Sequence, residues 1–334
     1  MPPVPFATQS YLSASLPVSA QRAVNCYAEQ EPQDAKTPVA VLGAPGLVQF
    51  AICGSGPVRG FNFMNGVAYV VSGQRLYSLT SAGVVTDIGG SIAGFGQVGM
   101  ANNGTQICIV NGLEGFIWSQ TGGFQVITSV NFYAANTVTF FDNYFVFDKA
   151  ASNLFFISAS ADGTSYSGTD FAAAEVQSDY VLSIVNQQET LLIFGERTIE
   201  TWYDAGALNF PFLRTSGATI ERGCAALRTP IKEDNSVFFL GNDLVFYRLN
   251  GTSLERISTH AIEDAFQSYS TVSDAYTFSY TYEGHKFINL VFPTANESWV
   301  YDIATKLWHE RESWDPNNNS YGRWRNGRAR HSND

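Results

Sequence analysis

A unit of four short strands repeats along most of this chain, and no other feature limits its fold as strongly. The first unit has apolar, alternating stretches at 58–64, 67–71, 75–79 and 84–88, separated by turn residues. Its first two stretches meet at Asn65-Gly66, the dipeptide most typical of a two-residue β-hairpin turn. Stretches this short, joined by such turns, predict an antiparallel meander rather than helices.

Five further units follow the same plan. The second covers 97–101, 105–110, 115–119 and 124–128; the third 137–141, 144–148 and 153–159, before a long polar loop over 160–180; the fourth 181–185, 190–195, 198–203 and 212–214; the fifth 226–233, 236–241, 244–249 and 253–257; the sixth 276–282, 285–292, 298–303 and 307–311. About six four-stranded units, spaced by roughly 35–45 residues, predict an all-β, β-propeller-like fold. Blades packed around an axis bury one another and leave only short edges. A β-sandwich or a β-helix is the alternative.

The composition agrees with a β-rich chain. Charged residues make up only 15% of the sequence, well below the roughly 25% of an ordinary globular chain, which excludes a coiled coil and a charge-rich disordered protein. The 25 Phe and 16 Tyr suit half-buried pleated surfaces, and the 29 Gly suit tight turns.

Outside the repeats, the amino-acid composition changes at both ends of the sequence. Residues 1–50 hold seven prolines, which predicts an extended N-terminal arm, because proline fixes φ and removes a backbone donor. We expect the propeller to span residues 51–314. Residues 315–334 form a polar, Arg-rich C-terminal tail without alternation.

One short helix is predicted within the repeats, over 258–269. Its apolar side chains share one face, and Ser258 or Thr259 is suited to cap its first turn. In the arm, the Pro17 start signal also favours a short helix around 18–27.

The chain is acidic, with 19 basic and 30 acidic residues and a net charge of −11. The arm carries −1 and the tail +2, so the propeller region holds about −12. Such a surface repels phosphate backbones, so tight DNA coating is not expected. A wall that DNA slides past without sticking is consistent with this charge.

Motifs for catalysis are missing from the sequence. The four histidines have no metal-ligand spacing, and there is no GxSxG elbow, P-loop or GxGxxG motif. The nearest match to a sialidase Asp-box, at 160–166, is one residue short and predicts an Asp-stabilised turn. We expect no enzyme activity, no metal and no cofactor; paired carboxylates of a glycosidase stay open as an alternative. The four scattered Cys are expected to be free thiols.

Nothing in the sequence predicts export or a membrane span. The N-terminus lacks a basic segment followed by an apolar run, and no stretch approaches the ~20 apolar residues of a membrane helix.

A series of segments resembles the packaged-DNA stabilisation, or tail hub, proteins of short-tailed, P22-like bacteriophages. In chain order the matching segments are 10–12, 15–22, 24–25, 43–47, 56–60, 162–166, 170–172, 174–175, 195, 200–202, 210–212, 217–225 and 256–263. The specificity lies in their order, which covers most of residues 6–314. Members commonly continue past 308–314 with strand-rich sequence, which the polar tail here does not match.

The resemblance implies a non-enzymatic structural protein of the virion tail, made and assembled in the bacterial host cytoplasm. Such a protein is a propeller-like subunit of a homohexameric ring at the head-to-tail connector, below the portal and its adaptor. The ring closes the DNA exit channel, stabilises packaged DNA, and docks a tail needle and tailspikes or fibres. DNA is expected to pass through the channel without tight binding. A carbohydrate-binding or glycoside-cleaving propeller is the alternative function.

Two sets of residues are candidates for contacts. The arm is expected to dock outside its own propeller, on the portal or a neighbouring subunit, because its apolar residues would otherwise be exposed; the candidates are Leu16, Pro17, Val18, Gln21, Arg22, Asn25 and Tyr27. The arginines of the tail are candidate contacts to DNA or a partner: Arg323, Arg325, Arg328 and Arg330.

Overall fold

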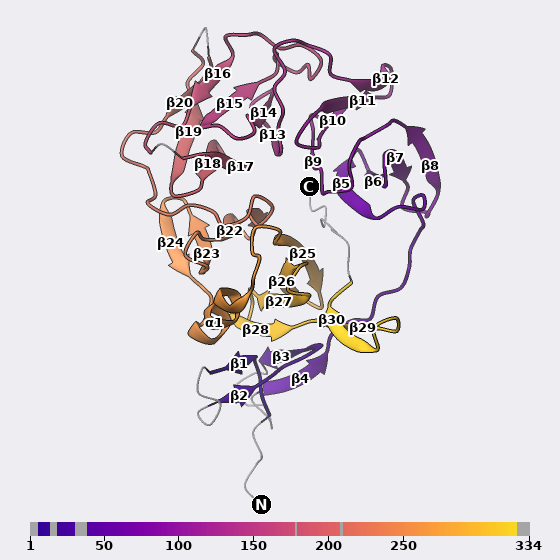
Figure 1. Cartoon of the computed structure of the whole chain (residues 1–334), viewed down its shortest axis with the longest axis vertical. Coiled ribbons are helices and arrows are strands. Elements are labelled where there is room, and N and C mark those ends of the chain that lie inside the picture. Colours follow the sequence, from indigo (N-terminus) through magenta and orange to yellow (C-terminus); the bar gives the residue numbers. More distant parts are fainter. Residues whose placement is uncertain (1–5, 14–18, 31–38, 178, 208–209, 326–334) are drawn as a thin grey trace, which may run out of the picture.

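Six four-stranded antiparallel sheets surround a common axis in the computed structural model, which describes residues 6–13, 19–30, 39–177, 179–207 and 210–325 (Figure 1). Blade 1 comprises β5 (Val58–Met64), β6 (Val67–Ser72), β7 (Arg75–Leu79) and β8 (Val85–Gly89); blade 2 β9 (Gly99–Asn102), β10 (Gln106–Val110), β11 (Gly115–Ser119) and β12 (Gly123–Val126); blade 3 β13 (Val138–Phe141), β14 (Tyr144–Asp148), β15 (Leu154–Ile157) and β16 (Phe171–Ala173). Blade 4 comprises β17 (Val181–Gln187), β18 (Thr190–Gly195), β19 (Ile199–Asp204) and β20 (Phe212–Arg214); blade 5 β21 (Ile231–Glu233), β22 (Ser236–Leu240), β23 (Phe246–Asn250) and β24 (Ser253–Arg256); blade 6 β25 (Tyr276–Tyr282), β26 (His285–Phe292), β27 (Glu297–Asp302) and β28 (Leu307–Glu310). The predicted β-propeller is confirmed.

Turn chemistry explains why the blades could be found from local sequence. Asn65 and Gly66 both adopt positive φ, 51° and 78°, in the turn between β5 and β6. This is the backbone of a type I′ turn, whose twist matches that of the two strands it joins.

Blade 3 differs from the prediction in one strand. The stretch expected to be loop over 160–180 contains β16, which pairs with β15 through Phe156 and Phe171. Its three residues, Phe-Ala-Ala, show no apolar–polar alternation and follow a polar stretch, so its pairing is set by the partner strand.

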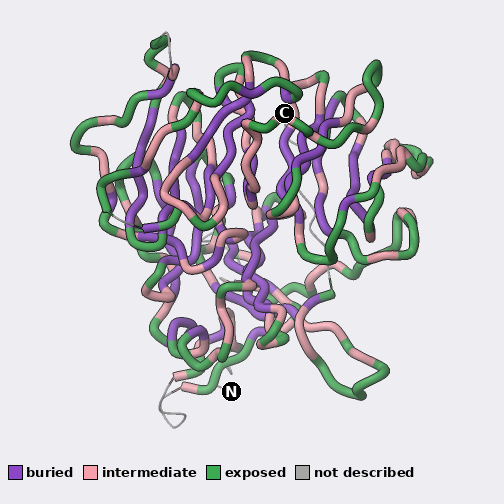
Figure 2. The backbone as a smooth tube through the Cα atoms, turned by 45° about the horizontal axis from the view of Figure 1, so that its top comes forward, coloured by how far each residue is buried: buried purple, intermediate pink, exposed green. Residues whose placement is uncertain are grey.

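Neighbouring blades are held together by apolar side chains from their facing surfaces. Five clusters each join two adjacent blades, from blades 1 and 2 through to blades 5 and 6. Figure 2 shows this burial running along the strands, while turns and outer edges are exposed. Burial of both faces of a blade provides the main stabilising free energy, which a single sheet lacks.

The junction between blades 6 and 1 is built differently. Within the described residues, no apolar cluster joins these two blades. The face of blade 6 turned away from blade 5 is instead covered by Tyr27 from the N-terminal region, against Phe287 and Val300, and by Trp324 from the C-terminal region, against Phe278. Both ends of the chain therefore complete the last blade.

The N-terminal region is not simply extended. It forms two hairpins, β1 (Tyr11–Leu12) with β2 (Ala20–Gln21) and β3 (Cys26–Gln30) with β4 (Val39–Gly43), which lie beside β28 (Figure 1). The helix expected around 18–27 is wrong. In the described residues from 19 on, β2 and the start of β3 lie here, and their backbone groups pair with other segments.

The helix predicted over 258–269 is confirmed as α1 (His260–Ser268), with Thr259 at its N-cap position. Its buried Ile262 and Phe266 join the cluster between blades 5 and 6. Ser258 donates its hydroxyl to the Glu263 carboxylate at 2.6 Å, so it contacts the first turn without being the cap.

A last hairpin follows blade 6, formed by β29 (Glu312–Asp315) and β30 (Ser320–Arg323). The polar sequence here does not show the alternation of a strand pair, so the hairpin was not predicted. It leads directly to the buried Trp324, whose backbone N–H donates to the Ser298 hydroxyl at 3.0 Å.

Candidate docking site of the N-terminal arm

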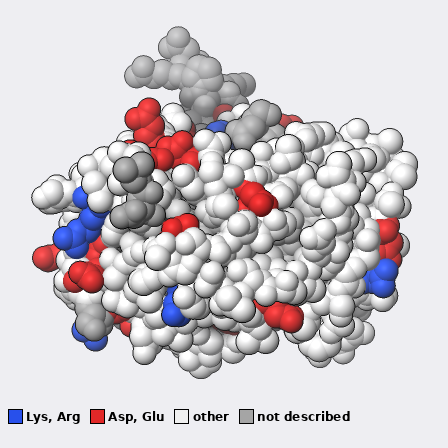
Figure 3. Space-filling view, turned by 90° about the horizontal axis from the view of Figure 1, so that it is seen from above, with Lys and Arg blue, Asp and Glu red and all other residues white. Residues whose placement is uncertain are grey.

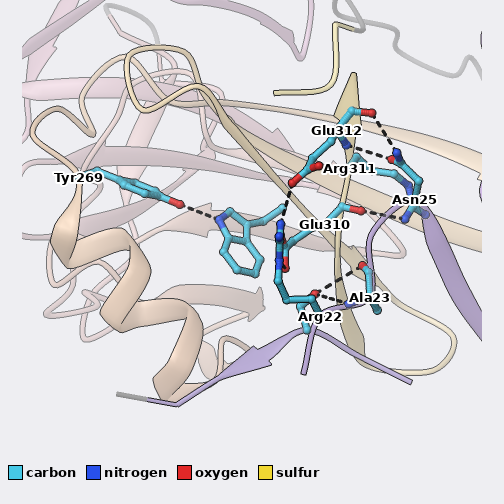
Figure 4. A network of polar contacts seen from close by, with 9 residues as sticks. Arg22, Ala23, Asn25, Tyr269, Glu310, Arg311 and Glu312 are labelled. Atoms are coloured by element: carbon cyan, nitrogen blue, oxygen red, sulfur yellow. Dashed lines mark hydrogen bonds and ion pairs between the residues drawn. The ribbon is translucent and has the colours of Figure 1, made fainter. Parts of the chain in front are cut away.

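The arm adds a short parallel strand to the outer edge of blade 6. Val24 and Glu310 form a parallel bridge, in which the Asn25 N–H donates to the Glu310 carbonyl at 3.0 Å and the Glu310 N–H donates to the Ala23 carbonyl at 2.9 Å (Figure 4). The outer strand of a blade has unpaired backbone groups, which this segment satisfies.

Arg22 fixes the same segment through charge. Its guanidinium binds the Glu310 carboxylate through Nε and Nη2, and Nη2 also donates to Glu312 Oε1 at 2.7 Å. Hydrogen bonds to Glu310 raise the pKa of Arg22, against a smaller lowering by burial. The nearly buried Glu310 carboxylate therefore has a permanent positive partner, as a bidentate arginine provides.

The side chain of Asn25 forms two hydrogen bonds with the backbone of Glu312, next to this ion pair. Its side-chain Nδ2 donates to the Glu312 carbonyl at 3.1 Å, and its Oδ1 accepts from the Glu312 N–H at 3.0 Å. The residue has a φ of 53°, a left-handed conformation that Asn tolerates better than most residues. This geometry turns the chain from the parallel bridge into β3.

Tyr27 is the apolar anchor of the arm, with 1% of its surface exposed. Its ring lies edge-on to Phe287, with centroids 5.5 Å apart, and its hydroxyl donates to Glu283 Oε2 at 3.1 Å. Burial and the Glu283 carboxylate raise the pKa of Tyr27 to about 12. A buried tyrosine with a satisfied hydroxyl is typical of a stable interface.

These contacts correct the expectation that the arm docks away from its own propeller. Arg22, Asn25 and Tyr27 contact blade 6 or the hairpin after it within the same chain, and Gln21 pairs with Tyr11 in the β1–β2 hairpin. The physical reason is that blade 6 has both an open edge and an uncovered apolar face. Leu16, Pro17 and Val18 lie outside the described residues, and docking on a portal or neighbouring subunit stays a prediction.

The sequence did not point to the acidic partners in this site. Glu310 and Glu312 lie 288 and 290 residues after Arg22. The only local signal was a pair of glutamates at the end of the last predicted strand.

Of the four candidate arginines of the tail, two lie in the described residues, and both are engaged within the chain. Arg323 Nη1 donates to the Tyr276 hydroxyl at 3.3 Å, and Arg325 forms an ion pair with Asp315. Arg328 and Arg330 lie outside the described residues. The face seen in Figure 3 has scattered acidic side chains, few basic ones and broad uncharged areas, with no basic patch.

Arg228 closes one end of the propeller's central channel. It precedes the inner strand of blade 5, and its Nη2 donates to the carbonyls of Gln97, at 3.2 Å, and Asn136, at 2.7 Å, which precede the inner strands of blades 2 and 3. Blade 6 joins the same end through a parallel bridge between Arg228 and Tyr276. Burial lowers the pKa of Arg228 to about 10, which the nearby Asp148 partly opposes.

The other end of the channel opens into a polar cavity of about 880 Å³. Amide side chains dominate its wall: Asn62, Asn65, Asn102, Gln187, Gln188 and Asn235. Three of its charged residues are in ion pairs: Lys286 Nζ donates to Glu233 Oε1 at 2.8 Å, and Asp234 pairs with Arg248. Lys232 donates to the Asn186 side-chain oxygen at 3.0 Å, so the cavity offers mainly polar groups with two lysines and two carboxylates among them.

Within the described residues, no group of three or more His, Cys, Asp or Glu side chains could hold a metal ion. The same part of the chain has no helix long and apolar enough to cross a membrane.

Fold and site together define a structural β-propeller, whose axis is closed by an arginine and whose last blade is completed by both chain ends. The sequence matches the family model of the bacteriophage P22 Gp10 β-propeller over residues 18–330, so the chain belongs to this family. The family consists of structural phage proteins, which indicates a structural component of the virion that assembles with other virion proteins.

No curated protein matches the chain. Among solved structures, the computationally designed Ika8 protein is 11% identical, with a TM-score of 0.46 over 79% of this chain and 82% of its own. The N-terminal domain of Nup159 is 10% identical, with a TM-score of 0.46 over 77% and 76%. PorZ of Porphyromonas gingivalis, a component of the type-IX secretion system, is 13% identical, with a TM-score of 0.37 over 76% and 33%. These three structures are too distant to carry an argument.

Proposed function

We propose that this protein is the tail hub of a short-tailed phage, forming a six-fold ring below the portal and its adaptor. The ring closes the DNA exit channel, stabilises the packaged DNA, and offers docking sites for a tail needle and tailspikes or fibres. The protein is assembled in the host cytoplasm and stays in the virion tail. The observation that carries this proposal is the family match over residues 18–330.

The closed axis of the subunit supports a path for DNA between subunits. Arg228 ties together the inner strands of several blades, so a duplex has no way through a single propeller. In the proposed ring, DNA passes through the space that the six copies enclose. The net charge of −11 per chain makes the wall of that space a poor ligand for phosphates.

The arm is the proposed contact to the portal or a neighbouring subunit. Arg22, Asn25 and Tyr27 hold it on blade 6, and this leaves exposed apolar side chains of its hairpins, Leu12, Val41 and Leu42, available for a partner. In this arrangement, Leu16, Pro17, Val18 and Gln21 belong to the same docking segment. The arginines Arg323, Arg325, Arg328 and Arg330 are assigned to a partner rather than to DNA.

The mass of the purified protein, measured under native conditions with and without a portal complex, tests this proposal. We expect a species of six chains, formed alone or on the portal. A single chain in both samples would contradict the hub function.

The second candidate function is a carbohydrate-binding propeller, which the amide-lined cavity favours. Only one aromatic side chain, Phe63, contributes to its wall, so a stacking platform of the usual kind is weak there. Binding of oligosaccharides that is lost in Asn102→Ala, or cleavage of a glycosidic bond, would favour this candidate over the hub.

A further inference from the structure

His285 lies between two carboxylates that belong to different parts of the molecule. Its Nδ1 is 2.7 Å from Asp302 Oδ2, and its Nε2 is 2.6 Å from Glu29 Oε2. A carboxylate accepts hydrogen bonds and does not donate them, so both ring nitrogens must carry a proton to make both contacts. The geometry is that of an imidazolium, although the side chain is only 6% exposed.

The two carboxylates are held differently. Asp302 is fully buried in blade 6, where its Oδ1 accepts from the Ala304 N–H at 2.9 Å and its Oδ2 accepts from the Thr305 hydroxyl at 2.8 Å. Glu29 lies on β3 of the arm, and its side chain is 36% exposed. Water can therefore solvate the Glu29 carboxylate when its hydrogen bond to His285 is lost. The contact between His285 and Glu29 is therefore the one that a loss of charge breaks.

Two titratable side chains near His285, Tyr27 and His309, stay neutral near neutral pH. From β3, Tyr27 packs against the imidazole with centroids 5.0 Å apart, and its pKa is raised to about 12. From β28, burial lowers the pKa of His309 to about 4, so it stays neutral. Arg311, just after β28, donates to the Cys26 carbonyl at 2.8 Å, and Glu283, bound to the Tyr27 hydroxyl, is the remaining acidic neighbour.

We propose that His285 is a pH-dependent latch, which holds the β3–β4 hairpin more tightly on blade 6 while it is protonated and lets the hairpin open more often at alkaline pH. The segment before the hairpin stays in place, because Arg22 keeps its charge throughout this range. Release of the hairpin uncovers the apolar face of blade 6 around Phe287 and Val300. This is a property of the single chain, independent of the proposed ring.

The direction of the pH effect follows from the contacts. Burial lowers the pKa of His285, but the hydrogen bonds to Glu29 and Asp302 outweigh it, so the pKa lies above the ordinary value of 6.5. A raised pKa in the folded state means that the stabilisation is complete below pH 6.5 and is lost as pH rises through the higher, folded-state value. The hairpin is therefore held more tightly at pH 6 than on the alkaline side.

Hydrogen exchange of the isolated chain, corrected for intrinsic rates, tests the latch between pH 6 and 9. We expect protection of residues 26–30 to fall at least several-fold over this range, while protection of β22 in blade 5 changes little. In His285→Gln, the hairpin should be poorly protected at every pH. The matched control is His260→Gln, which removes an exposed histidine from α1 and should leave the pH profile of residues 26–30 as in the wild type.

A second variant keeps the test decisive if His285→Gln does not fold. Glu29→Gln changes only an accessible arm residue, and it should flatten the pH profile while blade 6 stays protected. Equal protection of residues 26–30 at pH 6 and 9 in the wild type would overturn the latch, as would a profile that is unchanged in Glu29→Gln.

Discussion

Tyr27 of the N-terminal arm lies edge-on to Phe287 of blade 6, with ring centroids 5.5 Å apart, although the two residues are separated by most of the chain. This contact places the arm inside the hydrophobic structure of the propeller. Replacing Tyr27 with Ala should therefore lower the free energy of unfolding by about 3–5 kcal/mol, the cost of removing a buried aromatic side chain. Chemical denaturation measures this loss.

Tyr27→Phe is the matched control. It keeps the ring and removes only the hydrogen bond to Glu283, so we expect a loss of about 0.5–1.5 kcal/mol. Equal stability of Tyr27→Ala and the wild type would show that the arm does not contribute to the core.

Removal of residues 1–38 is the second prediction, and here the structure reverses the expectation from sequence. The sequence predicts an arm that docks outside its own propeller, so its removal would be expected to leave a folded β protein. The structure predicts that the truncated chain loses the parallel bridge at Val24 and the packing of Tyr27 on Phe287. Blade 6 should therefore be less stable than the remaining blades. Hydrogen exchange of β26 and β28 measures this effect; unchanged protection of both strands would contradict it.

The third prediction concerns the ion pair between Arg22 and Glu310. Arg22→Gln leaves a nearly buried carboxylate without its charged donor, and should cost about 1.5–3 kcal/mol, the value of hydrogen bonds to charged groups. Arg22→Lys keeps the charge but cannot match both carboxylate oxygens, so it should fall between Gln and the wild type. Thermal unfolding of the three proteins at one pH gives this order, and an equal melting temperature for all three would refute it.

The fourth prediction concerns the closed axis. Arg228→Met removes the donor to the Gln97 and Asn136 carbonyls, and also the positive neighbour of the buried Asp148. Leaving buried polar and charged groups uncompensated should cost about 3–5 kcal/mol. Arg228→Lys, which keeps the charge, should lose less, and urea denaturation distinguishes the two. An Arg228→Met protein with the same free energy of unfolding as the wild type would contradict this prediction.

The fifth prediction concerns DNA. Screening limits electrostatic effects to about 8 Å at physiological salt. The chain has a net charge of −11, and the face seen in Figure 3 carries mostly acidic or uncharged side chains. We expect duplex DNA to bind no more tightly than the non-specific range of about 10⁻⁴–10⁻⁶ M. Replacing the four arginines at 323, 325, 328 and 330 with Gln should change this little. Submicromolar binding that is steeply salt-dependent and lost in that variant would identify a DNA clamp instead.

The blades could be predicted from the sequence, because the signals for strands and hairpin turns are local. A hairpin needs an alternating pattern and a turn residue that accepts positive φ, and both are present within a few residues of Asn65-Gly66. The same reasoning placed α1 from its apolar face. Among the blade strands the exception is β16, whose Phe-Ala-Ala sequence has no alternation.

The positions of the two terminal regions and the long-range polar contacts could not be predicted from local sequence. Arg22 and Glu310, or Glu29 and His285, lie more than 250 residues apart, and no periodicity connects them. Trp324 follows a polar stretch, yet it is buried against Phe278, because no apolar cluster from blade 1 covers this face of blade 6 in the described residues. Arg228 likewise has no local signal, since its partners are carbonyl groups that the arrangement of the blades around the axis brings together. Local sequence specifies the strands, whereas the packing of the blades, and the face of blade 6 that blade packing leaves open, select the long-range contacts.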